Sequence, residues 1–180
     1  MKSALIVVDM LNSYEHADAE KLTGSVERSL PAMARLVARG REEDVLTVYV
    51  NDNFGAWNSD RDALVEQVLD GEFRHLVEPI VPRDDTLFVV KARHSIFYQT
   101  PLEYLLRQEE VDRVVLVGQV TEQCILYSAL DAYIRHFEVV VPRDAVAHNH
   151  EDLAGAALRM MEGNMDADVC DADEVRLRDS

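Results

Sequence analysis

Cysteine, glycine, proline and lysine are all scarce in this chain of 180 residues. Two cysteines, Cys124 and Cys170, cannot supply the framework of a small disulfide-stapled protein. Seven glycines and five prolines are too few for a linker-rich or low-complexity chain. The length predicts one domain spanning residues 1–180, which is large enough to bury a hydrophobic core without staples.

Positive charge is also in short supply. The chain has 18 Lys and Arg against 34 Asp and Glu, which gives a net charge of −16 at pH 7. Such a chain repels phosphate backbones and anionic lipid surfaces, so we expect neither a nucleic acid nor a membrane as partner. No apolar run approaches the length of a membrane span, and the N-terminal apolar stretch is too short for a signal peptide. These features favour the cytoplasm, where both thiols stay reduced.

Short apolar runs alternate with helical patterns along the chain. The runs are continuous rather than alternating, which is typical of strands buried on both faces of a parallel sheet. They lie at residues 4–8, 45–50, 87–90, 114–117 and 139–141, with a weaker sixth at 167–170. The order predicts a Rossmann-like α/β fold with three layers and a mostly parallel sheet.

The helical patterns lie between these runs. We expect helices over residues 26–39, 61–69, 121–136 and 151–161, with a further start at Thr100, Pro101 and Glu103. Pro31 falls near the expected first turn of its helix, where proline is tolerated. Thr121 is a suitable N-cap for the helix that it opens.

Three reactive side chains follow predicted strands, where ligands bind in parallel α/β folds. Asp9 follows the first strand and Lys91, one of only three lysines, follows the third. Cys124 falls in the first turn of the helix after the fourth strand. The helix dipole and Lys91 would favour a thiolate, and Asp9 could exchange its proton, so the group can activate a cysteine without histidine.

Each of these residues also has an ordinary structural explanation. An aspartate after a strand is often a loop or cap residue, and a lysine there can simply pair with a carboxylate. A lone cysteine is most often part of the core, and Cys170 is expected to be such a residue. The functional interpretation therefore depends on the three residues together.

The sequence resembles the isochorismatase-like cysteine hydrolases over nearly its whole length. The resemblance is carried by LIVVDM at 5–10, KARHSIF at 91–97 and GQVTEQC at 118–124. It implies a six-stranded parallel sheet, an Asp9–Lys91–Cys124 triad and a homo-dimer or tetramer. It also implies a cis peptide bond between Gln119 and Val120, and an oxyanion hole formed by the backbone N–H groups of Val120 and Cys124.

The same resemblance implies a reaction. Cys124 attacks the carbonyl carbon of a small substrate, typically an amide, and Asp9 passes the thiol proton to the departing amine. Lys91 stabilises both anions, and water activated by Asp9 then hydrolyses the acyl-cysteine.

A catalytic metal is not expected, and neither is any other cofactor. Nicotinamidases of the family carry a metal site with an aspartate after the second strand and histidines close by. Asp52 matches that aspartate, but the next histidine is His75. An aspartate without imidazoles is a poor ligand set for zinc or iron. His148 and His150 lie in a polar turn and are a weak alternative.

Aromatic residues after the strands suggest where a small substrate binds. Tyr14, Phe54 and Trp57 occupy loop-like stretches, where core packing explains an aromatic less easily. We expect them to line the substrate pocket, although subunit contacts would explain them equally well.

Other functions remain open at this stage. A dinucleotide-binding domain needs glycines after the first strand, and residues 9–14 contain none. A phosphoacceptor receiver would place its lysine after the fifth strand rather than the third. An inactive ligand-binding or assembly module on the same fold, and an enol-ether hydrolase of the isochorismatase type, are the alternatives to an amide hydrolase.

Overall fold

A computed structural model describes residues 1–17 and 19–178. Its sheet pairs all neighbouring strands in parallel, in the order β3-β2-β1-β4-β5-β7, with β6 beside β4. The strands are β1 (Ser3–Val8), β2 (Leu46–Asp52), β3 (Leu87–Lys91), β4 (Arg113–Gln119), β5 (Glu138–Pro142), β6 (Val146–Ala147) and β7 (Asp168–Cys170). The predicted parallel α/β fold is confirmed, but the sheet has seven strands rather than six, because β6 is too short to form a recognisable apolar run.

The sheet has a hydrophobic core on each face, which explains the continuous apolar runs. Along β1, Leu5 and Val7 belong to one cluster of buried side chains. Ala4, Ile6 and Val8 belong to the other. Successive side chains of a strand point to opposite faces, so a central strand covered on both sides requires apolar residues at every position.

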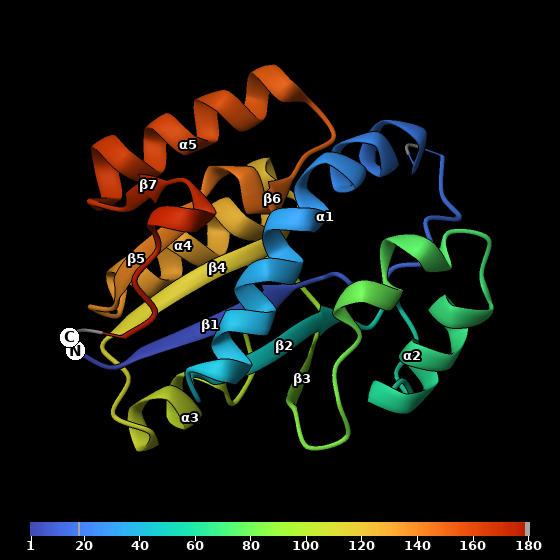
Figure 1. Cartoon of the computed structure of the whole chain (residues 1–180), viewed down its shortest axis with the longest axis horizontal. Coiled ribbons are helices and arrows are strands. Elements are labelled where there is room, and N and C mark those ends of the chain that lie inside the picture. The colour runs from blue at the N-terminus through green and yellow to red at the C-terminus, as the bar shows by residue number, and fades with distance from the viewer. Residues whose placement is uncertain (18, 179–180) are drawn as a thin grey trace.

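Helices cover both faces of the sheet, and α1 lies across one of them (Figure 1). Residues of α1 and α2 join the core on that face, whereas residues of α3, α4 and α5 join the core on the other. The helices are α1 (Ala19–Glu42), α2 (Arg61–Asp70), α3 (Leu102–Gln108), α4 (Leu126–Ile134) and α5 (Glu151–Met165). None of them, within the described residues, is both long and apolar enough to cross a membrane.

Two helix starts differ from the sequence prediction. Helix α1 begins at Ala19, so Pro31 lies inside it rather than near its first turn. The buried side chains of Leu22 and Val26 extend the apolar stripe toward the N-terminus, and their burial offsets the helix-breaking effect of proline. Glu103 pairs with Arg135 rather than completing a capping box.

The segment after β4 also departs from prediction. Residues Thr121–Ile125 form a π-helical turn, and α4 begins only at Leu126. Thr121 does not cap this turn, because its hydroxyl donates to the carbonyl of Ala147, 2.9 Å away, next to β4 in the sheet. A tertiary hydrogen bond thus replaces the local one expected from the sequence.

Gly118 allows β4 to lie against β1 just before the site. Its φ of +115° lies in the region that favours glycine, and a Cβ built there would sit 2.1 Å from the carbonyl oxygen of Val8. The close approach brings the carboxyl ends of β1 and β4 together, with β2 and β3 beside them.

Candidate active site

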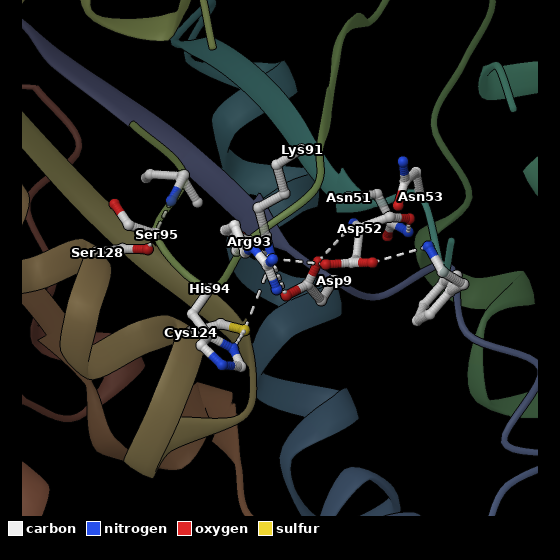
Figure 2. A network of polar contacts seen from close by, with 12 residues as sticks. Asp9, Asn51, Asp52, Asn53, Lys91, Arg93, His94, Ser95, Cys124 and Ser128 are labelled. Atoms are coloured by element: carbon white, nitrogen blue, oxygen red, sulfur yellow. Dashed lines mark hydrogen bonds and ion pairs between the residues drawn. The ribbon is translucent and has the colours of Figure 1, made fainter. Parts of the chain in front are cut away.

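The structure brings Asp9, Lys91 and Cys124 together at the carboxyl edge of the sheet. The Lys91 ammonium lies 2.9 Å from Asp9 Oδ2 and 3.6 Å from Cys124 Sγ. Figure 2 shows the lysine nitrogen contacting both the carboxylate and the sulfur. All three residues are buried. The strand order explains the convergence, because β1 lies between β2 and β4, and β3 pairs with β2.

Asp9 is held by its backbone and by its neighbours. Its φ of +54° is uncommon, although aspartate tolerates it better than most residues. Asp9 Oδ1 accepts a 2.7 Å hydrogen bond from the Asp52 N–H, and the Asp9 carbonyl accepts one of 2.7 Å from Gln119 Nε2. These contacts fix the carboxylate toward Lys91 and the sulfur.

Lys91 has acceptors around its whole ammonium group. Besides Asp9 and the sulfur, it lies 3.0 Å from the carbonyl oxygen of Arg93 and 3.6 Å from Asp52 Oδ2. Burial opposes the charge on Lys91, but attraction to Asp9, Cys124 and Asp52 outweighs it and raises the pKa of the lysine. The raised pKa favours the protonated form of Lys91, whose ammonium can donate hydrogen bonds but cannot accept them.

Burial favours the thiol form of Cys124, whereas the sequence argument weighed only the groups that favour a thiolate. Burial first, and then the Asp9 carboxylate, raise the pKa of Cys124 from 9.0 to about 12, although Lys91 opposes them. Burial also raises the pKa of Asp9. The attraction of Lys91 and the hydrogen bond between Asp9 and Cys124 oppose this shift. A carboxylate with a raised pKa is a better proton acceptor than an ordinary one.

The turn that carries the cysteine is tied to the neighbouring loop. The peptide bond between Gln119 and Val120 is cis, at the position that the resemblance implies. Glu122 Oε1 accepts hydrogen bonds of 2.9 Å from the N–H groups of both Asn149 and His150. Together with the Thr121 hydroxyl, these contacts fix the backbone around Cys124.

His94 is a site residue that the sequence argument missed. Its Nδ1 lies 3.8 Å from Cys124 Sγ, and its ring packs on that of Tyr127 with centroids 5.6 Å apart. Unlike the three buried residues, His94 is exposed. The available signal was its place three residues after Lys91, within a segment already singled out by resemblance.

Two of the three predicted pocket aromatics line a cleft that Lys91 also borders, and the third does not. Phe54 and Trp57 border a cleft of about 690 Å³ that also reaches Asp52, Lys91 and Arg93. Trp57 is 85% exposed and Phe54 is 53% exposed.

Tyr14 lies in the core instead of the cleft, which corrects the prediction. It is 1% exposed, its ring contacts Phe73 edge-on, and its hydroxyl donates to Gln119 Oε1 at 3.3 Å. Because Gln119 donates in turn to the backbone of Asp9, Tyr14 supports the site from behind.

The donor set around Asp52 does not fit the metal site of nicotinamidases. One oxygen of Asp52 accepts from the Phe54 N–H and the other faces Lys91. Its neighbours Asn51 and Asn53 carry amides that bond to nearby backbone groups. Across the described part of the chain, no three His, Cys, Asp or Glu side chains gather in a group suited to an ion.

A family model identifies the protein family to which this fold and site belong. The model for the isochorismatase domain matches residues 3–174. The chain therefore belongs to the isochorismatase family, as the sequence motifs indicated.

Three relatives illustrate the range of this family. YaaI of Bacillus subtilis (strain 168), named an isochorismatase family protein, is 30% identical over 96% of this chain and 95% of its own. The maleamate amidohydrolase of Pseudomonas putida is 28% identical over 84% of this chain and 75% of its own. The crystal structure of N-carbamoylsarcosine amidase from Thermoplasma acidophilum has a TM-score of 0.74 and 26% identity, covering 98% of this chain and 99% of its own.

Proposed function

We propose that this protein is a cysteine hydrolase that cleaves a small, non-peptide amide through a covalent acyl-cysteine. The observation that carries the proposal is the buried Lys91 ammonium, 2.9 Å from Asp9 and 3.6 Å from the Cys124 sulfur. The ion pair compensates both buried charges, and it places beside the sulfur a carboxylate that can take its proton, which a sulfur surrounded only by hydrocarbon would lack.

The first chemical step follows from the protonation states. The Cys124 proton moves to the Asp9 carboxylate as the sulfur bonds to the substrate carbonyl carbon. Lys91 offsets the negative charge on sulfur and carboxylate during the transfer. Asp9 then gives the proton to the amide nitrogen as the C–N bond breaks, which releases an amine or ammonia and leaves a thioester. Water hydrolyses that thioester to the acid and restores the thiol.

Charge on the substrate oxygen needs donors of its own. We assign these to the backbone N–H groups of Val120 and Cys124, which lie at the two ends of the turn that carries the nucleophile. The contacts of Thr121 and Glu122 support this assignment, because they hold that turn in one conformation before substrate arrives.

The cleft and the relatives indicate the kind of substrate. Phe54 and Trp57 line a cleft that Lys91 also borders, and such an aromatic cleft suits a small molecule better than a polypeptide. Two relatives are named maleamate amidohydrolase and N-carbamoylsarcosine amidase, and both names refer to small amide-type compounds. We expect no resident metal or other cofactor in this reaction.

The direct test is ammonia release from a panel of maleamate, ureidoacrylate and N-carbamoylsarcosine. At least one compound should be hydrolysed by the intact protein, and Cys124→Ala should abolish the reaction. Cys170→Ala is the matched control and should retain it, because Cys170 lies on β7 away from the triad. Hydrolysis that survives Cys124→Ala would contradict the acyl-cysteine mechanism.

We further expect the protein to act in the cytoplasm as a homo-dimer or tetramer. Helix α4 exposes Tyr133 and Ile134 on its outer face, and a second copy could cover these side chains. Light scattering of the purified protein gives the mass directly, and a monomeric mass would contradict this expectation.

A further inference from the structure

We propose that the substrate of this hydrolase carries a carboxylate in addition to its amide, and that the guanidinium of Arg93 binds that carboxylate. The inference rests on the proposed function, because it names the substrate class of the same site. Its starting observation is a cation without a protein partner. Arg93 is exposed and lines the aromatic cleft. Its guanidinium forms neither an ion pair nor a hydrogen bond with residues 1–17 or 19–178.

The other two charged side chains that line this cleft, Asp52 and Lys91, already have partners. Lys91 pairs with Asp9 at 2.9 Å, and its side chain is fully shielded from solvent. Asp52 lies 3.6 Å from the same ammonium and accepts a 2.7 Å hydrogen bond from the Phe54 N–H. Two carboxylates thus share one ammonium, so an anionic substrate would be repelled unless the cleft held a further cation. Arg93 is that cation.

The backbone of Arg93 is fixed close to the nucleophile. Its carbonyl oxygen accepts a 3.0 Å hydrogen bond from the Lys91 ammonium, which also lies 3.6 Å from the Cys124 sulfur (Figure 2). One ammonium therefore contacts both the backbone of Arg93 and the sulfur. Because the side chain of Arg93 borders the cleft, a short molecule can place its amide at the sulfur and its other end at the guanidinium.

A guanidinium is suited to a carboxylate at that other end. It keeps its positive charge, and its planar N–H donors form two parallel hydrogen bonds with the two carboxylate oxygens. Phe54, Trp57 and Tyr98 line the same cleft, so the carbon chain between amide and carboxylate has aromatic side chains to pack on. A short monoamide of a dicarboxylic acid has both groups and such a chain.

The test compares succinamate with succinamide, and maleamate with maleamide, by ammonia release. Within each pair, one end is a carboxylate in the first compound and an uncharged amide in the second. In at least one pair, the unmodified protein should hydrolyse the charged compound with a kcat/KM about 10–100-fold higher. Arg93→Gln should remove this preference, mainly by raising KM for the charged compound, and leave the uncharged one unaffected. Arg93→Lys should retain only part of the preference, because an ammonium cannot form the paired hydrogen bonds.

Arg159→Gln is the matched control, because Arg159 is exposed on α5 and does not line the cleft. It removes the same charge and should leave every rate unchanged. Equal or faster hydrolysis of the uncharged compounds, or an equal loss for both members of a pair in Arg93→Gln, would overturn the inference.

A second probe separates this inference from the proposed function. p-Nitrophenyl acetate has no carboxylate, so it should acetylate Cys124 equally fast in the unmodified protein and in Arg93→Gln, as the intact mass shows. Acetylation of Cys124 without hydrolysis of any of the four amides would overturn the role of Arg93 and leave Cys124 as a nucleophile. If Cys124 is never acetylated and no amide is hydrolysed, the proposed function fails and this inference fails with it.

Discussion

The Lys91 ammonium forms an ion pair of 2.9 Å with Asp9, and its side chain is fully shielded from solvent. Removing one partner of a buried ion pair leaves the other charge uncompensated. We therefore predict that Lys91→Met lowers the free energy of unfolding by about 3–5 kcal/mol and abolishes turnover. Urea unfolding followed by circular dichroism measures the loss of stability.

The control for this prediction also neutralises Asp9, the other charge of the ion pair. Adding Asp9→Asn to Lys91→Met removes the stranded carboxylate, so the double variant should be more stable than Lys91→Met by about 1–3 kcal/mol while staying inactive. Strict additivity of the two single variants would show that the charges do not interact in solution.

Cys124 and Cys170 are similarly buried, so Cys170 is a suitable reference for measuring how reactive the Cys124 thiol is. Cys124 is 9% exposed and Cys170 is 8% exposed. Burial is the first cause that raises the pKa of each thiol, to about 12 for Cys124 and about 11 for Cys170. The two pKa values alone predict that Cys170 reacts faster with iodoacetamide. Cys124, however, contacts the Asp9 carboxylate, which can accept its proton.

We accordingly predict that iodoacetamide near pH 7 modifies Cys124 about 100-fold faster than Cys170. Mass spectrometry of the digested protein gives both rates. Asp9→Asn should remove the advantage of Cys124 without changing the rate at Cys170. Faster reaction of Cys170 in the unmodified protein would favour an inactive binding module on this fold.

The convergence of Asp9, Lys91 and Cys124 could be predicted from the sequence because it depends only on strand order. Asp9 and Lys91 end short apolar runs, and Cys124 follows another, so a parallel sheet brings them together whatever the details of the loops. Asp52 was considered only as a metal ligand, and its register opposite Lys91 in β2 and β3 explains why it pairs with the lysine instead.

Side-chain contacts between distant loops could not be predicted in the same way. Tyr14 was expected in the substrate pocket, but its ring is buried and its hydroxyl donates a hydrogen bond to Gln119. Thr121 was expected to cap a helix, but its hydroxyl donates a hydrogen bond to the carbonyl of Ala147. The contact of His94 with the sulfur depends on the path of the loop after β3. Each of these outcomes was decided by tertiary neighbours that local sequence patterns do not specify.

Gly118 should tolerate no side chain. A Cβ there would lie 2.1 Å from the Val8 carbonyl oxygen, and the backbone φ is +115°. Gly118→Ala should therefore cost about 3 kcal/mol of stability or more, since it forces β1 and β4 apart. Thermal unfolding measures this cost.

Gly163 is the matched control for that substitution. It lies within α5, and nothing stands within 4 Å of the position that its Cβ would occupy. Gly163→Ala should raise the free energy of unfolding by about 0.5–1 kcal/mol, since alanine favours the helix. Equal effects at the two positions would contradict the close strand approach at Gly118.

The raised pKa of Cys124 predicts a loss of stability at alkaline pH. The thiol has a pKa of 9.0 in the reference state and about 12 in the folded protein, with burial as the main cause. Between those values the folded state binds more protons than the unfolded state, so stability present below pH 9 falls as the pH rises. By about pH 10 this group alone should cost about 1.4 kcal/mol.

Cys124→Ser isolates that contribution, because a serine hydroxyl does not titrate in this range. Urea unfolding at about pH 7.5 and about pH 10 should show that the unmodified protein loses about 1.4 kcal/mol more than the variant. Cys170, whose pKa is also raised, contributes to both proteins and cancels in the difference. Equal losses in the two proteins would mean that the Cys124 thiol ionises as readily in the folded site as in the unfolded chain.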